Sequence, residues 1–445
     1  MINFFLILGG AILLIPIILL SETIPYQEGW PVFVNGPLTS PIKIADIDND
    51  GEKEVIYGDG SFIGQSDWWM YVKRPDGTDE NGWPINNAGT PNPSAIFDYN
   101  DDGFLEIILA AGGLFLRSHE GDLIWEIPYD GPIFQNKYIA YNVSIDDLDN
   151  DGIKEIVVTT YDKPLAGGVF VFEPDGSLRE GWPVLYPNVN GTNCSASIGD
   201  IDKDGLKEII VTSDKIYCFK PDGNNCPGFP FGGERKWRSF DKPVLIDYNN
   251  DGYLEIIYAN TNAPPPMIIM LDYQGNIIPP YPLELYNGAG KISAGDLNLD
   301  GRLEFLITRY MGFIDAYDIE TAEILPNFPM TDPTGEFLVY HQSLLDLSDY
   351  YGKEILADGV KGALAIHAKL FAFQLNGEIV SGFPSDLLYF RSLLPCAVDD
   401  LDGDGDVEIC CGAQNEQNEI IRHTEVYCWD SPHPWNRDMA DWMMD

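Results

Sequence analysis

A short acidic phrase recurs eight times along this chain of 445 residues, at intervals of 47 to 54 residues. Each copy reads approximately Asp-x-Asp/Asn-x-Asp-Gly-x-x-Glu and leads directly into apolar residues. A fixed period in this range indicates a repeat architecture, in which each unit buries its apolar surface against its neighbours. The copies begin at Asp46, Asp98, Asp147, Asp200, Asp247, Asp296, Asp346 and Asp400.

The third repeat shows what one unit contains. A strand is expected at 141–145, before the acidic phrase, and a second in the β-branched run 156–160 that follows it. A third strand at 169–172 ends in a Pro-Asp-Gly turn, and a fourth begins at Gly181-Trp182-Pro183. Four antiparallel strands with no helical periodicity predict an all-β fold.

A single four-stranded sheet of this size cannot bury both of its faces, whereas sheets packed radially bury them against each other, as in a β-propeller. The eight units therefore predict an eight-bladed β-propeller, with seven blades as the alternative. Residues 29–33 resemble a fourth strand but precede the first unit, and the eighth unit has only three clear strands. We expect the N-terminal strand to close the ring by completing the last blade.

The propeller should occupy residues 25–435. The apolar run at 4–20 predicts a signal peptide or a membrane anchor within residues 1–24. Residues 436–445 form a tail that could contain a short helix. Export would permit disulfides among the seven cysteines, but their connectivity cannot be read from the sequence.

Each acidic phrase has the composition of a hard-cation site. Positions 1, 3 and 5 present carboxylate or amide oxygens, glycine at position 6 permits a sharp turn, and position 9 is glutamate. Ca²⁺ prefers such an all-oxygen shell, whereas Mg²⁺ is seldom held in a dedicated protein cage. The alternative, ordinary Asp-Gly turns, would leave acidic groups to repel one another in every loop. We therefore predict Ca²⁺ as the cofactor, in up to seven or eight sites.

The predicted metal ligands come from seven of the eight loops. They are Asp46, Asp48, Asp50, Glu54, Asp98, Asn100, Asp102, Glu106, Asp147, Asp149, Asp151, Glu155, Asp200, Asp202, Asp204, Glu208, Asp247, Asn249, Asp251, Glu255, Asp296, Asn298, Asp300, Glu304, Asp400, Asp402, Asp404 and Glu408. The seventh loop has Ser348 and Tyr350 at positions 3 and 5, and Gly352 is displaced by one position. We expect its site to be weak or empty.

The phrase at residues 46–54, followed by Val55-Ile56 and accompanied by seven relatives, resembles the FG-GAP/VCBS repeat of integrin-α-like β-propellers. The resemblance covers roughly residues 26–435. It implies calcium in the loops and ligand recognition on one face of the propeller. Members of this family serve in adhesion, in glycan binding and, in some polysaccharide lyases, in catalysis.

The formal net charge of −44 disfavours nucleic acid and anionic membranes as partners. No familiar hydrolase or zinc-protease motif occurs in the sequence. These features favour an adhesion or binding module for an extracellular glycan or protein ligand, located outside the cell or at its surface. It would be secreted or attached to the membrane through residues 4–20. The alternatives are a calcium-dependent glycan-processing enzyme, such as a polysaccharide lyase, and a structural subunit of a surface layer or filament.

Aromatic side chains are the candidate ligand contacts, because aromatic rings stack on sugars. Tryptophans at repeated positions, such as Trp83 and Trp182, are expected to pack between blades instead. Trp68, Trp69 and Trp237 stand in stretches that do not repeat, and they are therefore the candidate ligand-binding residues.

Overall fold

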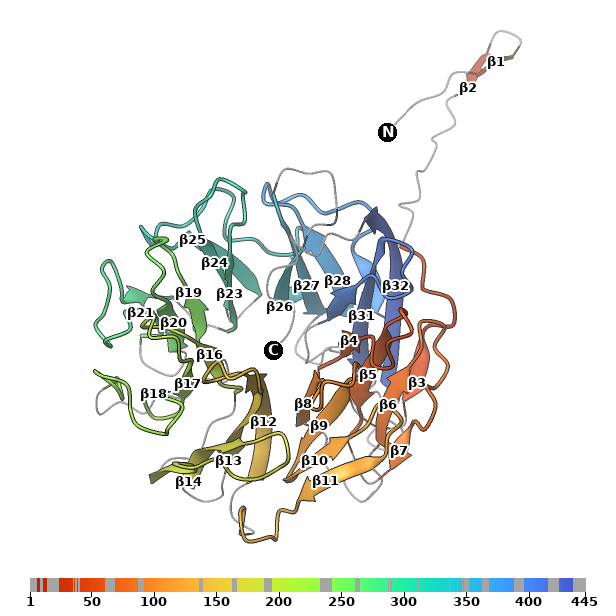
Figure 1. Cartoon of the computed structure of the whole chain (residues 1–445). Helices are drawn as coiled ribbons and strands as arrows, with labels where there is room; N and C mark the ends of the chain where they lie inside the picture. The colour runs from red at the N-terminus through yellow and green to blue at the C-terminus, as the bar shows by residue number, and fades with distance from the viewer. Residues whose placement is uncertain are drawn as a thin grey trace.

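Eight small antiparallel sheets follow one another around a central axis in the computed structural model of the chain, which is an eight-bladed β-propeller (Figure 1). Among the residues described, no helix is long and apolar enough to cross a membrane. The structure describes residues 6–8, 11–13, 24–34, 36, 38, 41–60, 69–86, 92–135, 139–161, 166–187, 194–232, 242–260, 265–286, 288, 290–309, 312–335, 337–345, 347, 352–361, 368–387, 396–414 and 424–434.

Each blade is a meander whose first strand lies nearest the axis (Figure 1). Blades 1 to 4 contain β4 (Lys43–Ala45), β5 (Glu54–Gly58), β6 (Trp69–Lys73), β7 (Ile85–Asn86); β8 (Asn92–Phe97), β9 (Glu106–Ala111), β10 (Gly113–Arg117), β11 (Leu123–Ile127); β12 (Ile139–Asp146), β13 (Glu155–Tyr161), β14 (Ala166–Phe172), β15 (Val184–Pro187); and β16 (Ser197–Gly199), β17 (Glu208–Thr212), β18 (Ile216–Phe219). Blades 5 to 8 contain β19 (Val244–Ile246), β20 (Glu255–Asn260), β21 (Met267–Leu271), β22 (Leu283–Glu284); β23 (Ile292–Gly295), β24 (Glu304–Arg309), β25 (Phe313–Asp318); β26 (Phe337–Leu345), β27 (Glu354–Lys361), β28 (Ala368–Phe373), β29 (Ser385–Leu387); and β30 (Ala397–Asp399), β31 (Asp406–Gln414), β32 (Thr424–Pro434), β3 (Val32–Val34).

Blades 4 and 6 have three regular strands, and their fourth position is marked by a single β-bridge. Ile216 pairs with Phe231 in blade 4, and Ile314 pairs with Met330 in blade 6. Both bridges extend the third strand of the blade at its outer edge. The period of the acidic phrase therefore predicted the number of blades correctly.

The N-terminal strand closes the ring. β3 pairs antiparallel with β32, with Val32 opposite Val426, and an isolated bridge between Tyr26 and Trp429 continues the pairing. The last blade thus takes its outermost strand from the start of the chain, as the sequence predicted.

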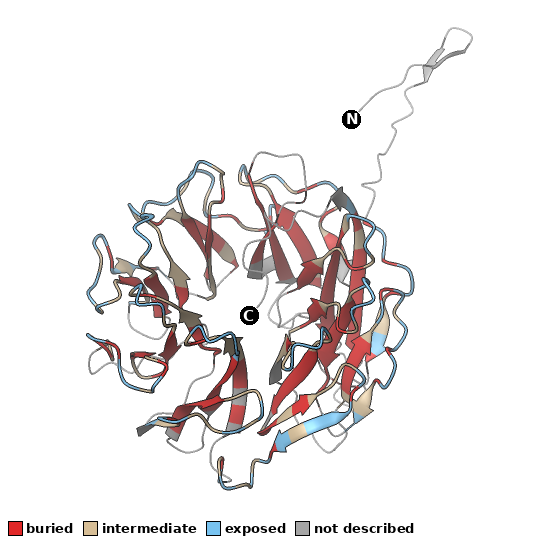
Figure 2. Ribbon diagram, viewed as in Figure 1, coloured by how far each residue is buried: buried red, intermediate tan, exposed pale blue. Residues whose placement is uncertain are grey.

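The middle strands are buried because each blade is covered on both faces. All five residues of β5 are buried, which explains why the sequence after each acidic phrase is continuously apolar rather than alternating (Figure 2). Val55 and Tyr57 pack in one cluster with Val426 of blade 8, while Ile56 packs in another with Ile107 of blade 2. Successive side chains of one strand therefore belong to two different inter-blade cores.

Three disulfides lie within blades. Cys218–Cys226 joins the third strand of blade 4 to the segment that follows it, while Cys396–Cys411 and Cys410–Cys428 join neighbouring strands of blade 8. The seventh cysteine, Cys194, is buried and forms no disulfide, and its Sγ lies 3.2 Å from Thr212 Oγ1. Blade 8, where β3 joins β30 to β32, is therefore also the blade with two covalent crosslinks.

The apolar N-terminal segment contributes one short hairpin, in which β1 (Leu6–Leu8) pairs with β2 (Ala11–Leu13). The rest of the predicted signal or anchor, up to residue 23, lies outside the described residues. So does the predicted C-terminal tail at 436–445.

Candidate functional site

The acidic loops connect the first and second strands of each blade, and their own side chains hold them in shape. In six loops the aspartate at position 1 accepts a hydrogen bond from the amide of the glycine at position 6, as Asp46 does from Gly51 at 3.1 Å. The residue at position 4 has a left-handed backbone, with φ of 58° at Asn49, and Gly51 has φ of 99°. Two positive φ values so close together turn the chain sharply, and the second favours glycine.

The glutamate at position 9 links the end of every loop back to its beginning through a hydrogen bond. Its Oε2 accepts the backbone N–H of position 2, and the distance is 2.9 Å for Ile47 to Glu54 and 2.6 Å for Leu401 to Glu408. The same bond occurs in all eight loops; the other six acceptors are Glu106, Glu155, Glu208, Glu255, Glu304 and Glu354.

These glutamates are buried carboxylates, and burial shifts their titration. Desolvation raises the pKa of Glu54 and Glu408 to about 8, against an opposing effect of the hydrogen bond from position 2. It raises the pKa to about 7 in four other loops, at Glu106, Glu208, Glu255 and Glu304. Neighbouring aspartates add to the upward shift, so a cation bound beside one of these glutamates would favour its charged form.

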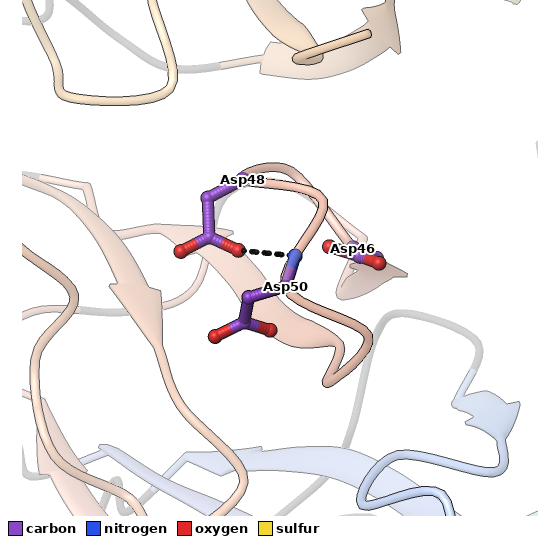
Figure 3. Close-up of side chains that lie close together, drawn as sticks. All are labelled: Asp46, Asp48 and Asp50. Carbon is purple, nitrogen blue, oxygen red and sulfur yellow. Dashed lines mark hydrogen bonds between the residues drawn. The ribbon is translucent and has the colours of Figure 1, made fainter.

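The carboxylates of single loops converge closely enough to share one ion. In loop 1, Asp46, Asp48 and Asp50 each offer an oxygen, and these oxygens all lie within 4.8 Å of one another (Figure 3). Equivalent groups occur in loops 3, 4 and 8; they are Asp147, Asp149 and Glu155; Asp200, Asp202 and Glu208; and Asp400, Asp402 and Asp404.

Several of these oxygens are buried without a hydrogen-bond partner in the described part of the chain. Asp46 Oδ1 in loop 1 and Glu408 Oε1 in loop 8 are examples. A buried carboxylate oxygen with no donor is costly, and a hard cation would satisfy it. The donor set, oxygen only and rich in carboxylate, therefore fits Ca²⁺.

In the seventh loop the structure describes only part of the predicted sequence. Glu354 is buried and its Oε2 accepts the N–H of Leu347 at 2.8 Å, so the bond between positions 9 and 2 is the same as in the other seven loops. Asp346, Ser348 and Tyr350 lie outside the described residues. The expected weak or empty site stays a prediction.

The loops of successive blades contact one another. The amide at position 8 of one loop donates to the carbonyl at position 2 of the loop before it, as Lys53 does to Leu401 at 3.1 Å, across the seam of the ring. Four further interfaces repeat this bond; they are Leu105 to Ile47, Lys207 to Leu148, Leu254 to Ile201 and Lys353 to Leu297. Among the described residues these bonds link the loops of blades 8, 1 and 2, of blades 3, 4 and 5, and of blades 6 and 7, all at one end of the propeller.

A second contact between blades joins the two other repeated sequence signatures. The indole N–H of Trp182 in blade 3 donates to the carbonyl of Pro221 in blade 4 at 2.9 Å. The equivalent bonds run from Trp30 in blade 8 to Pro75 O in blade 1, and from Trp83 in blade 1 to His119 O in blade 2. A Cβ added at Gly181 would lie less than 3.0 Å from the carbonyl oxygen of Asp222. The Gly-Trp-Pro phrase of one blade therefore docks on the turn after the third strand of the next blade, which is Pro-Asp-Gly in blades 1 and 4 and His-Glu-Gly in blade 2.

The sequence reading missed two members of this docking series. Trp125 of blade 2 has no Gly-Trp-Pro phrase, yet its indole donates to Pro174 O at 2.9 Å. In blade 5 the hydroxyl of Tyr281 donates to Ile319 O at 2.8 Å. An aromatic donor at the repeat spacing is the signal that would have identified both.

The candidate ligand-binding tryptophans are mostly beyond what the structure describes. Trp68 and Trp237 lie outside the described residues. Trp69 opens β6, is half-buried and packs against the core between blades 8 and 1. Because the strands alternate in direction, this start of β6 lies at the end of the propeller opposite the acidic loops.

A cavity of about 440 Å³ lies on the axis, between the first strands of blades 1 to 5. Its polar lining includes Lys43, Ser144, Asp146, Ser197 and Lys242, among apolar side chains such as those of β8. A mixed lining of this kind can accept a small polar group, whereas the inter-blade cores cannot.

Comparison with known proteins supports the repeat and the fold. The FG-GAP-like repeat family matches residues 147–211 and 247–307. No curated protein sequence matches the chain. The chain therefore contains FG-GAP-like repeats in a β-propeller.

Three solved structures show the same fold at low sequence identity. The V. cholerae biofilm matrix protein Bap1 aligns with a TM-score of 0.62 and 10% identity, covering 95% of this chain and 94% of Bap1. Sqt1 of Saccharomyces cerevisiae aligns at 0.53 with 13% identity, covering 92% and 100%. The computationally designed Ika8 protein aligns at 0.51 with 10% identity, covering 91% and 99%.

Proposed function

We propose that this protein is an exported, calcium-stabilised β-propeller that acts as an adhesion or ligand-binding module at the cell surface. The observation that carries the proposal is that the acidic loops lie together at one end of the ring and are joined there by hydrogen bonds between blades. Each loop is shaped by its own hydrogen bonds, and several hold buried carboxylate oxygens that lack a donor. Calcium at these positions would fix the ends of the strands and so the relative positions of the blades.

A ligand would be bound at the opposite end. The second strands end there and the third strands begin there, and Trp69 lies at the start of one of them. We propose an extracellular glycan or protein as the ligand, because the net charge of −44 opposes binding to nucleic acid.

Export is supported by the composition and the crosslinks. Three disulfides are characteristic of oxidising compartments, and the apolar run at 4–20 would direct or anchor the chain. The V. cholerae protein Bap1, of the same fold, is a biofilm matrix protein. An extracellular setting also supplies calcium at the concentrations that weak loop sites need, roughly 0.1–1 mM.

The test is a binding screen of the full chain on a glycan array and on intact cells, with calcium and after chelation. The proposal predicts saturable binding of one ligand that disappears when calcium is chelated. The Trp69→Ala variant should also lose this binding while its calcium content stays unchanged. If the protein instead depolymerised an acidic polysaccharide with calcium-dependent turnover, it would be a lyase and the binding-module proposal would be wrong. Recovery of the protein only in the cytoplasm of its cells would overturn export.

A further inference from the structure

The eight acidic loops differ in the side chains that face them from the outer part of the same blade. One such neighbour is the residue three positions before the aromatic residue that opens the fourth strand, such as Trp30 or Trp182. It is Gln27 in blade 8, whose amide donates to Asp402 at 2.8 Å, and Arg179 in blade 3. The last residue before the Pro-Asp-Gly turn is another, and in blade 4 it is Lys220.

In loop 3 a guanidinium lies among the predicted calcium ligands. Arg179 forms ion pairs through Nη2 with Asp149 Oδ2 and through Nη1 with Glu155 Oε1, and Nη1 is 3.5 Å from Glu173 Oε1. Its side chain is only 17% exposed, and Glu155 is fully buried. Arginine remains charged at any physiological pH, so this position carries a permanent cation.

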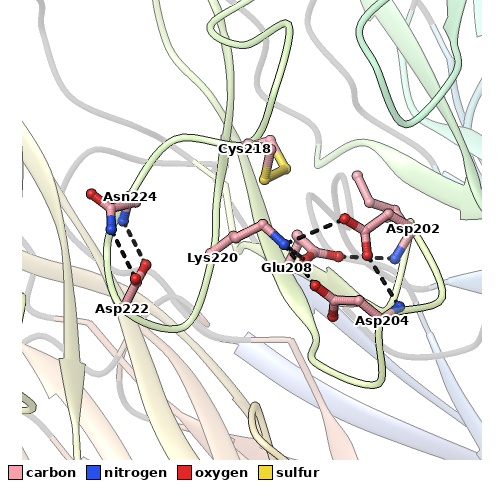
Figure 4. The surroundings of a disulfide bond; sticks show 9 residues. Asp202, Asp204, Glu208, Cys218, Lys220, Asp222 and Asn224 are labelled. Carbon is pink, nitrogen blue, oxygen red and sulfur yellow. Dashed lines mark hydrogen bonds and ion pairs between the residues drawn. A yellow bond between two sulfur atoms is a disulfide. The ribbon is translucent and has the colours of Figure 1, made fainter.

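In loop 4 an ammonium group takes the same place. Lys220 Nζ lies 2.7 Å from Asp204 Oδ2, 3.3 Å from Asp202 Oδ2 and 3.6 Å from Glu208 Oε1 (Figure 4). Positions 3, 5 and 9 of the loop therefore all face one cation that belongs to the chain. Figure 4 shows the lysine extending into the loop from the strand that carries Cys218.

Loop 1 provides the contrast. Blade 1 also has an arginine before its turn, but Arg74 pairs with Glu80 at 2.6 Å and not with the loop. Within the described residues, no ion pair joins a cationic side chain to Asp46, Asp48 or Asp50. The predicted ligands of loop 8 are likewise approached by the neutral amide of Gln27.

We propose that Arg179 and Lys220 are tethered counter-ions that take the place of Ca²⁺ in loops 3 and 4. The inference rests on the proposed calcium binding in the other loops. A divalent ion could enter either loop only by displacing a cation that already makes two or three carboxylate contacts, and the two positive charges would repel each other at that range. Blades 3 and 4 would then hold their loops without metal, while loops 1, 2, 5, 6 and 8 depend on it.

The experiment measures bound calcium per chain in the full-length protein, after chelation and equilibrium dialysis against calcium. Arg179→Met and Lys220→Met should each bind one more calcium than the wild type, because each uncovers a set of carboxylates. Lys215→Met, in the turn between β17 and β18 and away from the loops, is the control for the change in net charge and should bind the same number as wild type. Unchanged counts in both loop variants would overturn the inference.

A second set of variants covers the case in which a methionine variant does not fold. Asp149→Ala and Asp202→Ala should leave the calcium count of the otherwise native chain unchanged, whereas Asp48→Ala should lower it by one. A loss of one calcium in Asp202→Ala would show that loop 4 binds metal and would overturn the inference. A wild type that binds no calcium at all would instead overturn the proposed function, and the counter-ion role with it.

Discussion

Gly181→Ala tests whether the docking of each blade's Gly-Trp-Pro phrase on the next blade's turn holds the ring together. Gly181 has φ of 91°, and a Cβ there would lie less than 3.0 Å from the backbone carbonyl of Asp222 in blade 4. The positive φ costs an alanine about 1–2 kcal/mol. The forced separation of two packed backbones should add about 1–3 kcal/mol, as overpacking does in other cores.

Gly377→Ala is the matched control. Gly377 lies in the turn after β28 of blade 7, the equivalent of the Pro-Asp-Gly turn on which the preceding blade docks; it has φ of 86°, but nothing lies within 4 Å of its added Cβ. The blade facing it has Asn327 where other blades have glycine, and the Asn327 amide donates to Leu375 O at 3.2 Å. This variant should therefore lose only the backbone contribution, about 1–2 kcal/mol.

The assay is equilibrium urea unfolding of both variants and the wild type, in saturating calcium and followed by tryptophan fluorescence. Gly181→Ala should be less stable than Gly377→Ala by about 1–3 kcal/mol, the contribution of the inter-blade contact alone. Equal losses in the two variants would refute the reasoning, because the two glycines have similar positive φ values but differ in what an added Cβ would contact.

Three further outcomes are expected. Trp182→Phe removes the indole donor from the buried carbonyl of Pro221 and should lower the free energy of unfolding by about 1–3 kcal/mol in the same urea assay; no loss would remove the indole from the docking contact. Calcium-free protein should become less stable as pH rises from 5 to 8.5. Glu54 has a pKa of about 8 in the folded state against 4.5 in the unfolded state, so between these values it carries a proton only when the protein is folded, and the stability that this proton contributes is lost as pH rises. Calcium should abolish that fall, which a melting series with and without chelator would show; a chelated protein that gains stability over this range would contradict the burial argument. Replacing Cys410 and Cys428 by serine opens a link across 18 residues and should cost about 3 kcal/mol at the closing blade, again by urea unfolding, whereas an unaltered midpoint would show that β32 needs no crosslink.

The sequence predicted the parts of the fold that repeat. The spacing of the acidic phrase gave eight blades, and the isolated phrase at 29–33 predicted correctly that β3 completes the last sheet. Both succeed because local turn chemistry and apolar runs determine a meander, and a meander with two apolar faces can only be packed against another. The form of each loop was predictable for the same reason, since glycine at position 6 and glutamate at position 9 act within nine residues.

What the sequence did not predict arises between segments that are distant along the chain. Asp202 belongs to a complete set of ligands in the sequence, but Lys220, 18 residues later, reaches the same carboxylates only after the blade has formed. Arg179 lies 30 residues from Asp149. Trp125 was missed because its neighbours do not repeat, although its place in the sheet is the same. A side chain's role is set here by which loop it faces, and that depends on the register of the third and fourth strands.

The most direct test of the account is the number of calcium ions bound per native chain. Eight loops, less the degenerate seventh and the two that contain Arg179 and Lys220, leave five. Isothermal titration calorimetry of the calcium-free full-length protein should give about five sites. The melting temperature should rise as these sites fill, because an ion that binds only the folded state stabilises it. A protein that binds no calcium, or whose melting temperature is unaffected by it, would contradict the claim that the acidic loops are metal sites.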